Sequence, residues 1–582
     1  MDLLPPPKKI TRLPDFCASR KIKKIFAPTG RSEPDAYRLS ITPGGVTIEA
    51  ADEAGLFYAA RTLDQIKRQF PSALPCMDIL DWPDYPVRGF YHDVTRGKVP
   101  RLKTLLALAE TCASYKLNHL ELYIEHTYAF KSYPEVWQGS DPLTADEILA
   151  LDARCAELRI DLVPSFSAFG HFYTWIHHKF PELNELDRNV SQEPFCWWDR
   201  MMHYTLDCRN PRSIALVREI IREVRPLFRS RFFNICADET FDLGMGRNKA
   251  LAEKLGKGRL YVDFLKQILS AVKHAGAVPL FWGDIIGKYP ELVKEIPPEA
   301  IALDWDYSAG LNHAKARVMM ESNRKFYVCP GVSGWNNWLP NQDVAHRNIT
   351  RFARMGLRSG AAGLLNTDWG DYGHINTLGP TLPGIVLGAC SSWNAGSGAL
   401  SMKKFEPAVS RMTLGDRSGK LAGLLREAAS AGRAKWTKVC WIFQPRSVDF
   451  DGWFDAAGFP NDMLKHPASV HFTALAKLKT LTTRIERVLA RCEPADPLLT
   501  EEIRVGLLGM TAMEEFHLHC CRLAGKTKRA IPRPGITASH LLDLDRRLEA
   551  VWLKRNKPSE YFRIREVLSA AVDFCTKPGR GK

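Results

Sequence analysis

The sequence has no segment that could cross a membrane and no recognisable secretion signal. Its 582 residues contain no run of about 18 apolar residues, the length that predicts a membrane-spanning helix. The N-terminal stretch 1–16 has no apolar core long enough for a signal peptide, although a peptide trimmed from the chain would leave no trace in it. We therefore expect a cytoplasmic protein without a membrane span.

Paired cysteines are also lacking. The 14 cysteines include no Cys-x-x-Cys pair, and several lie in apolar segments, as Cys236 does, where a thiol behaves as a small hydrophobic group. This pattern favours a reducing compartment over a disulfide scaffold. His517, His519, Cys520 and Cys521 could suggest a metal site, but no further ligands at metal spacing lie nearby, so a buried helix is the better interpretation.

Features of nucleic-acid binding are missing as well. The net charge is +15, but the excess is spread along the chain in short runs such as Lys8-Lys9. No basic helix with base-stacking aromatic residues occurs. The basic residues are better explained as a solvated surface, and no nucleic-acid partner is expected.

The first 83 residues predict a small α+β domain. Segments 37–41 and 46–50 alternate apolar and polar residues around a Pro-Gly-Gly turn, which predicts a β-hairpin. Residues 52–69 have apolar side chains at helical spacing. The proline-rich segment 81–86 marks the junction with the next domain.

The region 84–400 alternates short apolar runs with helical stretches, for example at 102–115, 145–158 and 261–275. Eight units of a strand followed by a helix predict a (β/α)₈ barrel of the TIM type, so the fold class is α/β. A doubly wound open sheet is the alternative, but it would more often carry a glycine-rich phosphate loop after its first strand, and none is present. Residues 401–582 show helical patterns only, at 414–435, 469–490, 501–523 and 537–552, and predict a helical C-terminal domain. The sequence does not indicate the function of that domain. The predicted strands are 88–94, 118–124, 161–167, 232–238, 278–284, 300–307, 325–331 and 361–368.

The most informative segment is RFFNICADETFDLGMGRN, residues 231–248. An apolar run ends abruptly in two adjacent carboxylates, Asp238 and Glu239, as when a buried strand delivers acids to the mouth of a barrel. Such neighbours repel each other unless one stays ionised while the other keeps a proton. An aspartate that merely caps the next helix is the competing interpretation, and the rest of the chain favours catalysis.

Charged and aromatic residues also follow the other predicted strands, where a barrel carries its chemistry. Carboxylates and an arginine suit sugar hydroxyls, and flat aromatic rings suit the CH faces of a pyranose. A single Trp is more often core than pocket, but four at the same ends of four strands favour a sugar site. In chain order these residues are Asp93, Arg96, Glu125, His126, His171, Trp282, Asp284, Trp305, Asp306, Tyr307, Trp335, Trp369 and Asp371.

Seven segments carry a family pattern. They are ADEAGLFYAARTL (51–63), RGFYHDVTRG (88–97), KLNHLELYIEHTYAF (116–130), VPSFSAFGH (163–171), NICADET (234–240), FWGD (281–284) and NTDWGDYG (366–373). Together they resemble glycoside hydrolase family 20, the β-N-acetylhexosaminidases, over roughly residues 30–395. That family has an Arg shortly after strand one, a His ending strand three and an Asp-Glu pair ending strand four. Arg96, His171, Asp238 and Glu239 occupy those places.

The resemblance implies an exo-acting hydrolase that removes terminal β-linked GlcNAc or GalNAc from an oligosaccharide or glycoconjugate, without metal or cofactor. The implied mechanism is retaining and substrate-assisted. Glu239 would protonate the glycosidic oxygen and later activate water, while Asp238 would orient the 2-acetamido group and stabilise the oxazolinium. The implied substrate-binding residues are Arg96, Glu125, His171, Trp282, Trp305, Tyr307, Trp335, Trp369 and Asp371.

Two departures from the family pattern stand out. Many members carry Asp after strand two where this chain has Glu125, so the relay from His171 to an acid must use Glu125 or be altered. Cys236-Ala237 replace the glycines that often precede the acid pair, which is expected to narrow the approach slightly. A β-N-acetylgalactosaminidase or a hydrolase removing O-linked GlcNAc is the related alternative. An inactive sugar-binding barrel is the alternative of another class. The sequence leaves the sugar preference and the oligomeric state open.

Overall fold

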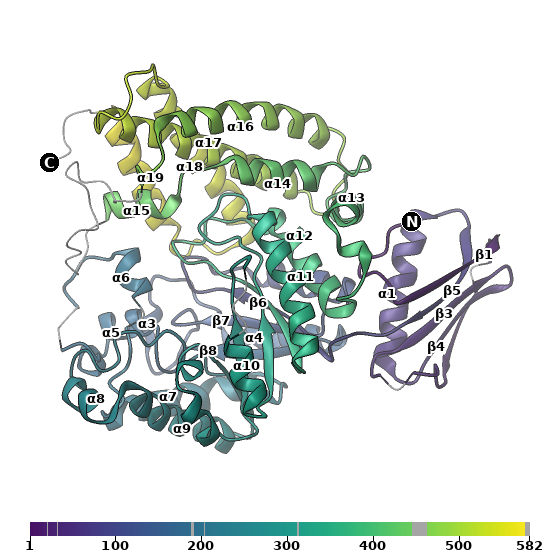
Figure 1. Cartoon of the computed structure of the whole chain (residues 1–582), viewed down its shortest axis with the longest axis horizontal. Coiled ribbons are helices and arrows are strands. Elements are labelled where there is room, and N and C mark those ends of the chain that lie inside the picture. Colours follow the sequence, from purple (N-terminus) through teal and green to yellow (C-terminus); the bar gives the residue numbers. More distant parts are fainter. Residues whose placement is uncertain are drawn as a thin grey trace.

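The computed structural model consists of an N-terminal sheet, a central barrel and a layer of C-terminal helices. Figure 1 shows the sheet to one side of the barrel and the C-terminal helices above it. Within the described part of the chain, no helix has both the length and the apolar character that crossing a membrane requires. The structure describes residues 1–19, 21–31, 33–187, 191–202, 204–310, 314–444 and 463–576.

The N-terminal unit is a five-stranded sheet in the order β1-β5-β3-β4-β2, packed against one helix. The predicted hairpin is confirmed, with Tyr37 opposite Ala50 and Ile41 opposite Val46. The sequence did not reveal the two outer strands, because nearly all their side chains are exposed and no alternation marks them. The elements are β1 (Lys9–Cys17), β2 (Ile22–Phe26), β3 (Tyr37–Thr42), β4 (Gly45–Ala50), α1 (Glu53–Gln69) and β5 (Leu74–Asp81).

Eight parallel strands close into a barrel, as predicted. The last strand pairs with the first through six residue pairs, from Gly363 opposite Val87 to Asp368 opposite His92. All eight predicted strands are present, and most bounds differ by one to three residues. They are β6 (Val87–Asp93), β7 (His119–Ile124), β8 (Asp161–Phe166), β9 (Phe232–Asn234), β10 (Val278–Trp282), β11 (Ile301–Trp305), β12 (Phe326–Cys329) and β13 (Gly363–Asp368).

Helices in the barrel region lie between these strands and after the last of them. The predicted helices at 102–115, 145–158 and 261–275 correspond to α2, α4 and α9. The helices are α2 (Leu102–Ser114), α3 (Pro134–Trp137), α4 (Ala145–Glu157), α5 (Tyr173–His178), α6 (Trp197–Met201), α7 (Pro211–Val224), α8 (Lys249–Leu255), α9 (Lys257–His274), α10 (Ala314–Glu321), α11 (Gln342–Arg358) and α12 (Leu378–Trp393).

The C-terminal region is helical, as predicted. One predicted helix, 414–435, is too long: Gly415 and Gly419 both have a φ of +72°, which the helical conformation does not allow, and α14 begins only after them. The division of the chain at residues 83 and 400 stays a prediction. The helices are α13 (Met402–Met412), α14 (Leu421–Ala431), α15 (Trp436–Phe443), α16 (Ala468–Leu489), α17 (Leu499–Leu523), α18 (Pro534–Arg555) and α19 (Tyr561–Thr576).

A buried cluster around Asp81 joins the N-terminal sheet to the barrel. The Asp81 carboxylate, at the end of β5, accepts hydrogen bonds from Tyr37 of the sheet and from Lys116 and Trp393 of the barrel region, at 2.7–3.0 Å. Lys116 and Asp81 are both almost fully buried. Burial lowers the pKa of Lys116, and Asp81 opposes that shift. The ion pair therefore fixes the sheet to the barrel in a setting where neither charge can reach water.

We expect Asp81→Asn to lower the free energy of unfolding by about 3–5 kcal/mol, the range for removing one partner of a buried ion pair. Asp78→Asn is the matched control, because Asp78 lies on the same strand and its pair with Arg38 is partly exposed. That change should cost about 1 kcal/mol or less. Urea unfolding followed by tryptophan fluorescence measures both. Equal losses in the two variants would contradict the role given to Asp81.

Candidate active site

The backbone after β9 turns both acids toward the barrel mouth. Strand pairing continues briefly past Asn234, since the Cys236 carbonyl accepts from the Trp282 amide at 2.8 Å. Cys236, Ala237 and Glu239 then adopt φ values of +56°, +64° and +50°. In a regular strand successive side chains point to opposite faces, and these left-handed residues break that alternation.

The same turn explains why the family resemblance implies glycines at these two positions. A left-handed residue other than glycine costs roughly 1–2 kcal/mol, so Cys236 and Ala237 hold the turn under strain. The expected narrowing of the approach is wrong. Cys236 points into the barrel interior, where its thiol lies 3.5 Å from the Ser165 hydroxyl, and neither residue lines the cavity. The replacement changes backbone strain rather than access.

A cavity of about 390 Å³ lies over the acid pair. It collects residues from five strand ends, those of β6, β9, β11, β12 and β13, which is the arrangement that the sequence predicted for a sugar pocket. Its predicted lining residues are Arg96, Asp238, Glu239, Trp305, Tyr307, Trp335, Trp369 and Asp371, and the further ones are Trp198, Met201, Met202, Phe241 and Tyr372. Four of these further residues were not predicted, because they lie on α6, or beside it, and on the loop after the acid pair, not at a strand end. Tyr372 was overlooked although it adjoins Asp371.

Three predicted pocket residues do not line this cavity. Trp282 is fully buried inside the barrel, with its ring centroid 5.8 Å from that of Trp369, and therefore supports the aromatic wall from below. Glu125 and His171 are also buried and lie behind Arg96. They would act on a substrate only indirectly, because Arg96 lies between them and the cavity.

Arg96 is the central cation of the site. Its guanidinium lies 3.2 Å from Asp371, 3.4 Å from Glu125 and 3.5 Å from Asp93. It also stands over the rings of Tyr123 and Trp369, about 5.0 Å from each centroid. With three carboxylates and two aromatic faces around it, Arg96 has one fixed position at the edge of the cavity.

His171 connects Arg96 to the acid pair. Burial, followed by the charge of Arg96, lowers the pKa of His171 well below its ordinary value, so the imidazole is neutral. Arg96 donates to His171 Nδ1 at 3.3 Å, which assigns the ring proton to Nε2, 3.5 Å from Asp238. Glu125 is farther from Nδ1, at 3.9 Å. The expected relay is thus altered, with Arg96 standing between His171 and Glu125.

Burial raises the pKa of both acids, and that of Glu239 lies above that of Asp238. Burial raises the pKa of Asp238 to about 6. Burial, with the charges of Asp238 and Asp284, raises the pKa of Glu239 to about 8. The pair exchanges its protons in two steps, so near neutral pH Glu239 carries a proton while Asp238 is largely ionised. That combination offers one proton donor and one negative charge to the same ligand.

Two trios among the described residues have the chemistry of metal ligands. One is His171 with Asp238 and Glu239, the acid pair itself. The other is His92, Asp368 and His374, outside the cavity over the acid pair, where His92 Nδ1 lies 3.2 Å from Asp368. A buried lysine, Lys98, lines the same small space, and burial lowers its pKa to about 8. His517, His519, Cys520 and Cys521 are all buried along α17, as the helix interpretation expects.

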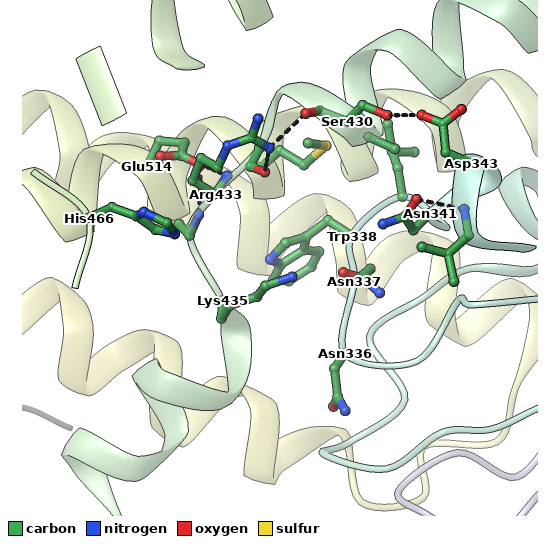
Figure 2. A pocket seen from close by; sticks show the side chains of 16 residues that line it. Asn336, Asn337, Trp338, Asn341, Asp343, Ser430, Arg433, Lys435, His466 and Glu514 are labelled. Carbon is green, nitrogen blue, oxygen red and sulfur yellow. Dashed lines mark hydrogen bonds between the residues drawn. The ribbon is translucent and has the colours of Figure 1, made fainter. Parts of the chain in front are cut away.

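A second cavity, of about 330 Å³, separates the loop before α11 from the C-terminal helices. Figure 2 shows hydrogen bonds that join the lining residues to one another. Ser430 donates to Asp343 at 2.6 Å, and Asn341 accepts from the Val344 amide at 3.2 Å. Glu514 accepts from the Ala434 amide at 2.8 Å. The acid pair is absent from this cavity, so the candidate chemistry stays at the barrel mouth.

Two family models match the chain. One, described as glycosyl hydrolase family 20, domain 2, matches residues 9–82, and another, the catalytic domain of the same family, matches residues 85–355. The chain belongs to glycosyl hydrolase family 20. The catalytic match contains Arg96, His171 and the acid pair, whereas Trp369 and Asp371 lie beyond its end. Membership confirms the resemblance found in the sequence and the barrel that it implied.

The sequence relatives are partial matches. A beta-hexosaminidase of Akkermansia muciniphila is 30% identical over 237 residues, which cover 36% of this chain and 45% of the relative. Beta-hexosaminidase subunit A1 of Dictyostelium discoideum is 26% identical over 221 residues, covering 35% and 39%. The chain thus spans less than half the length of these relatives.

Solved family 20 structures share the fold. A β-N-acetylhexosaminidase from Bacteroides fragilis has a TM-score of 0.58 at 18% identity, over 70% of this chain and 94% of that one. The chitobiase of Flavobacterium johnsoniae has a TM-score of 0.58 at 15% identity, over 99% of both chains. An exo-β-N-acetylglucosaminidase from Vibrio harveyi, solved with N-acetylglucosamine, has a TM-score of 0.57 at 18% identity, over 70% and 76%.

We expect the stability of the protein to fall as the pH rises from 5 to 8.5, in part because of Glu239. Its folded-state pKa of about 8 lies above the unfolded value of about 4.3, so folding favours the protonated carboxyl. The stability that this bound proton contributes is fully present below the pKa of the unfolded state. It is lost as the pH rises through the pKa of the folded state. Glu239→Gln should therefore show a smaller fall in Tm across this range than the unchanged protein.

The matched control is Glu295→Gln. Hydrogen bonding to Arg259 lowers the pKa of Glu295 to about 2, outside the tested range. Its Tm should follow pH as the unchanged protein does. A fall in Glu239→Gln as steep as in the control would show that Glu239 does not hold its proton in the folded state.

Proposed function

We propose that this chain is an exo-acting β-N-acetylhexosaminidase. It removes terminal β-linked GlcNAc or GalNAc from an oligosaccharide or glycoconjugate by a retaining, substrate-assisted mechanism. The observation that carries the proposal is the pair Asp238 and Glu239, adjacent in the chain, facing one cavity and holding their protons with different strengths. The 14 free cysteines, all but Cys208 and Cys492 buried, support a cytoplasmic location.

Glu239 has the properties of a general acid and base. It is protonated near neutral pH, its side chain is 25% exposed, and it lines the cavity. It would donate its proton to the glycosidic oxygen as the bond breaks and then accept one from the attacking water. Asp284 accepts a hydrogen bond from the Glu239 amide at 3.2 Å and so holds the backbone that presents the carboxyl.

Asp238 suits the positive charge that substrate assistance creates. In this route the 2-acetamido oxygen attacks the anomeric carbon, and an oxazolinium forms. Asp238, largely ionised and backed by neutral His171, would orient the amide and oppose that charge. Asp238 and Glu239 leave one short stretch of backbone, so they cannot flank a sugar from opposite faces as a double displacement requires.

Other carboxylates near the cavity have other partners. Asp371 receives hydrogen bonds from Arg96 at 3.2 Å and from Asn336 at 3.0 Å. Glu125 is buried against Arg96 behind the cavity. These contacts suit Arg96 and Asp371 to binding the outer hydroxyls of a terminal sugar, and they support an internal nucleophile supplied by the substrate.

The deciding experiment compares aryl β-glycosides of GlcNAc, GalNAc and glucose. Substrate assistance predicts hydrolysis of at least one acetamido sugar and none of the glucoside, which lacks the internal nucleophile. The ratio of kcat/KM for the two acetamido sugars measures the preference at O4. Failure to hydrolyse either of them would favour a sugar-binding barrel without catalysis.

Glu239→Gln should lose most turnover where the leaving group needs a proton. General acid catalysis typically contributes about 10²–10⁴-fold, so hydrolysis of a natural disaccharide should fall within that range. An aryl glycoside with an activated leaving group is the internal control, and its first step should be far less affected. Near-normal rates on the disaccharide would remove Glu239 from the role of acid.

A thiazoline analogue of the cyclised sugar should bind at least roughly 100-fold more tightly than the free sugar product, since it resembles the intermediate. Inhibition constants for both ligands, measured on the unchanged protein and on Asp238→Asn, test this. The variant should lose affinity for the thiazoline more than for the product. Trapping a covalent sugar on any carboxylate of the protein would instead demand double displacement.

A further inference from the structure

A chain of buried charges runs from the C-terminal region into the candidate active site. Glu560, just before α19, accepts a hydrogen bond from Arg200 Nη1 at 2.7 Å. Arg200, on α6, places its Nε 3.7 Å from Glu125. Glu125 lies 3.4 Å from Arg96, which borders the sugar cavity. All four side chains are less than a tenth exposed, so each charge depends on its neighbours rather than on water.

Arg200 and Arg96 together support the negative charge of Glu125, from 3.7 Å and 3.4 Å. Burial raises the pKa of Glu125, and the two charges that oppose this most are Arg200 first and Arg96 second. Asp93 adds a further unfavourable charge, and Tyr123 donates a hydrogen bond at 3.0 Å. The other titratable groups beside Glu125 are neutral His171, whose Nδ1 is 3.9 Å away, and His126, whose pKa burial and Arg200 lower well below its ordinary value.

Glu560 holds Arg200 in turn. Burial alone would raise the pKa of Glu560, but Arg200 and Arg563 lower it far below its usual range. This carboxyl is therefore ionised. A second hydrogen bond, from Arg200 Nη2 to the Thr95 carbonyl at 2.6 Å, fixes the other side of the guanidinium next to Arg96.

The backbones of the two regions are also joined here. The loop after Arg96 meets the segment between α18 and α19: Gly97 accepts from the Glu560 amide at 3.2 Å, and Val99 accepts from the Lys557 amide at 2.9 Å. The loop that carries Arg96 and the residue that holds Arg200 therefore form one connected unit.

We propose that Arg200 and Glu560 are positioning residues, through which the C-terminal region keeps Glu125 charged and so holds Arg96 at the substrate. The proposal rests on the proposed hydrolase function for its effect on catalysis. Neither residue would touch the sugar. Each would act on Arg96 through Glu125, and the helical region would thereby belong to the catalytic unit.

Arg200→Gln should narrow the pH profile of kcat/KM from its acidic side. Without Arg200, Glu125 would be buried against Arg96 alone, its pKa would rise, and protonation would release Arg96. Activity should thus fall roughly tenfold at pH 6 and recover toward pH 7.5, with the acidic midpoint raised by about one pH unit. Arg200→Lys, which keeps the charge, should restore the midpoint. Glu560→Gln should move it in the same direction by less.

Thr104→Val is the matched control, because Thr104 donates across the same interface, to the Arg555 carbonyl, without belonging to the charge chain. Its midpoint should not move. Loss of activity by one factor at every pH in Arg200→Gln, or an Arg200→Lys variant no better than Arg200→Gln, would overturn the proposal and leave Arg200 a structural residue.

A second measurement needs no activity. A raised pKa means that folding favours protonated Glu125, so Arg200→Gln should lose Tm relative to the unchanged protein as the pH rises from 5 to 8. In the double variant Arg200→Gln/Glu125→Gln this extra loss should disappear. A Tm deficit equal at all pH values in both variants would overturn the proposal. If the extra loss appears but no acetamido glycoside is hydrolysed, the electrostatic coupling stands and the proposed function fails.

Discussion

The buried guanidinium of Arg96 is the charge on which the geometry of the site depends. It stands among Asp93, Glu125 and Asp371, which come from three different strand ends. Because a buried cation is tolerated only when it is paired, these carboxylates must converge on it, and the loops that carry them converge as well. The cavity edge, the tautomer of His171 and the orientation toward Asp238 all follow from where Arg96 lies.

The acid pair depends on a different constraint, the left-handed turn after β9. Three residues with positive φ in four positions set Asp238 and Glu239 side by side over one cavity. Strain of this kind persists only where the surrounding structure enforces it. Here β10 continues to pair with the turn through the Trp282 amide, and Asp284 holds the amide of Glu239. Rigid strands therefore supply the placement that the two carboxyls need to differ in proton affinity.

Much of the fold could be predicted from the sequence because the buried face of a helix or strand repeats apolar residues at a regular spacing. The eight barrel strands are short apolar runs between segments with helical patterns. The hairpin at 37–50 alternates apolar and polar residues. Where an element buries little, as β1 does, the sequence carries no such mark. The helix predicted over 414–435 failed for a local reason: its apolar spacing continues through Gly415 and Gly419, but the backbone there does not.

Some features of the candidate site could likewise be predicted from the sequence and others could not. Residue type and position along one strand were enough to predict the barrel, the acids at the end of its fourth strand and the charged and aromatic residues at the other strand ends. Three-dimensional packing was needed to place Trp282 beneath the pocket, Arg96 between His171 and Glu125, and α6 in the cavity wall. It also joined Arg200 to Glu560, 360 residues away in the chain. Periodicity records whether a side chain is buried, but which partner it meets depends on how the barrel closes and what folds over it.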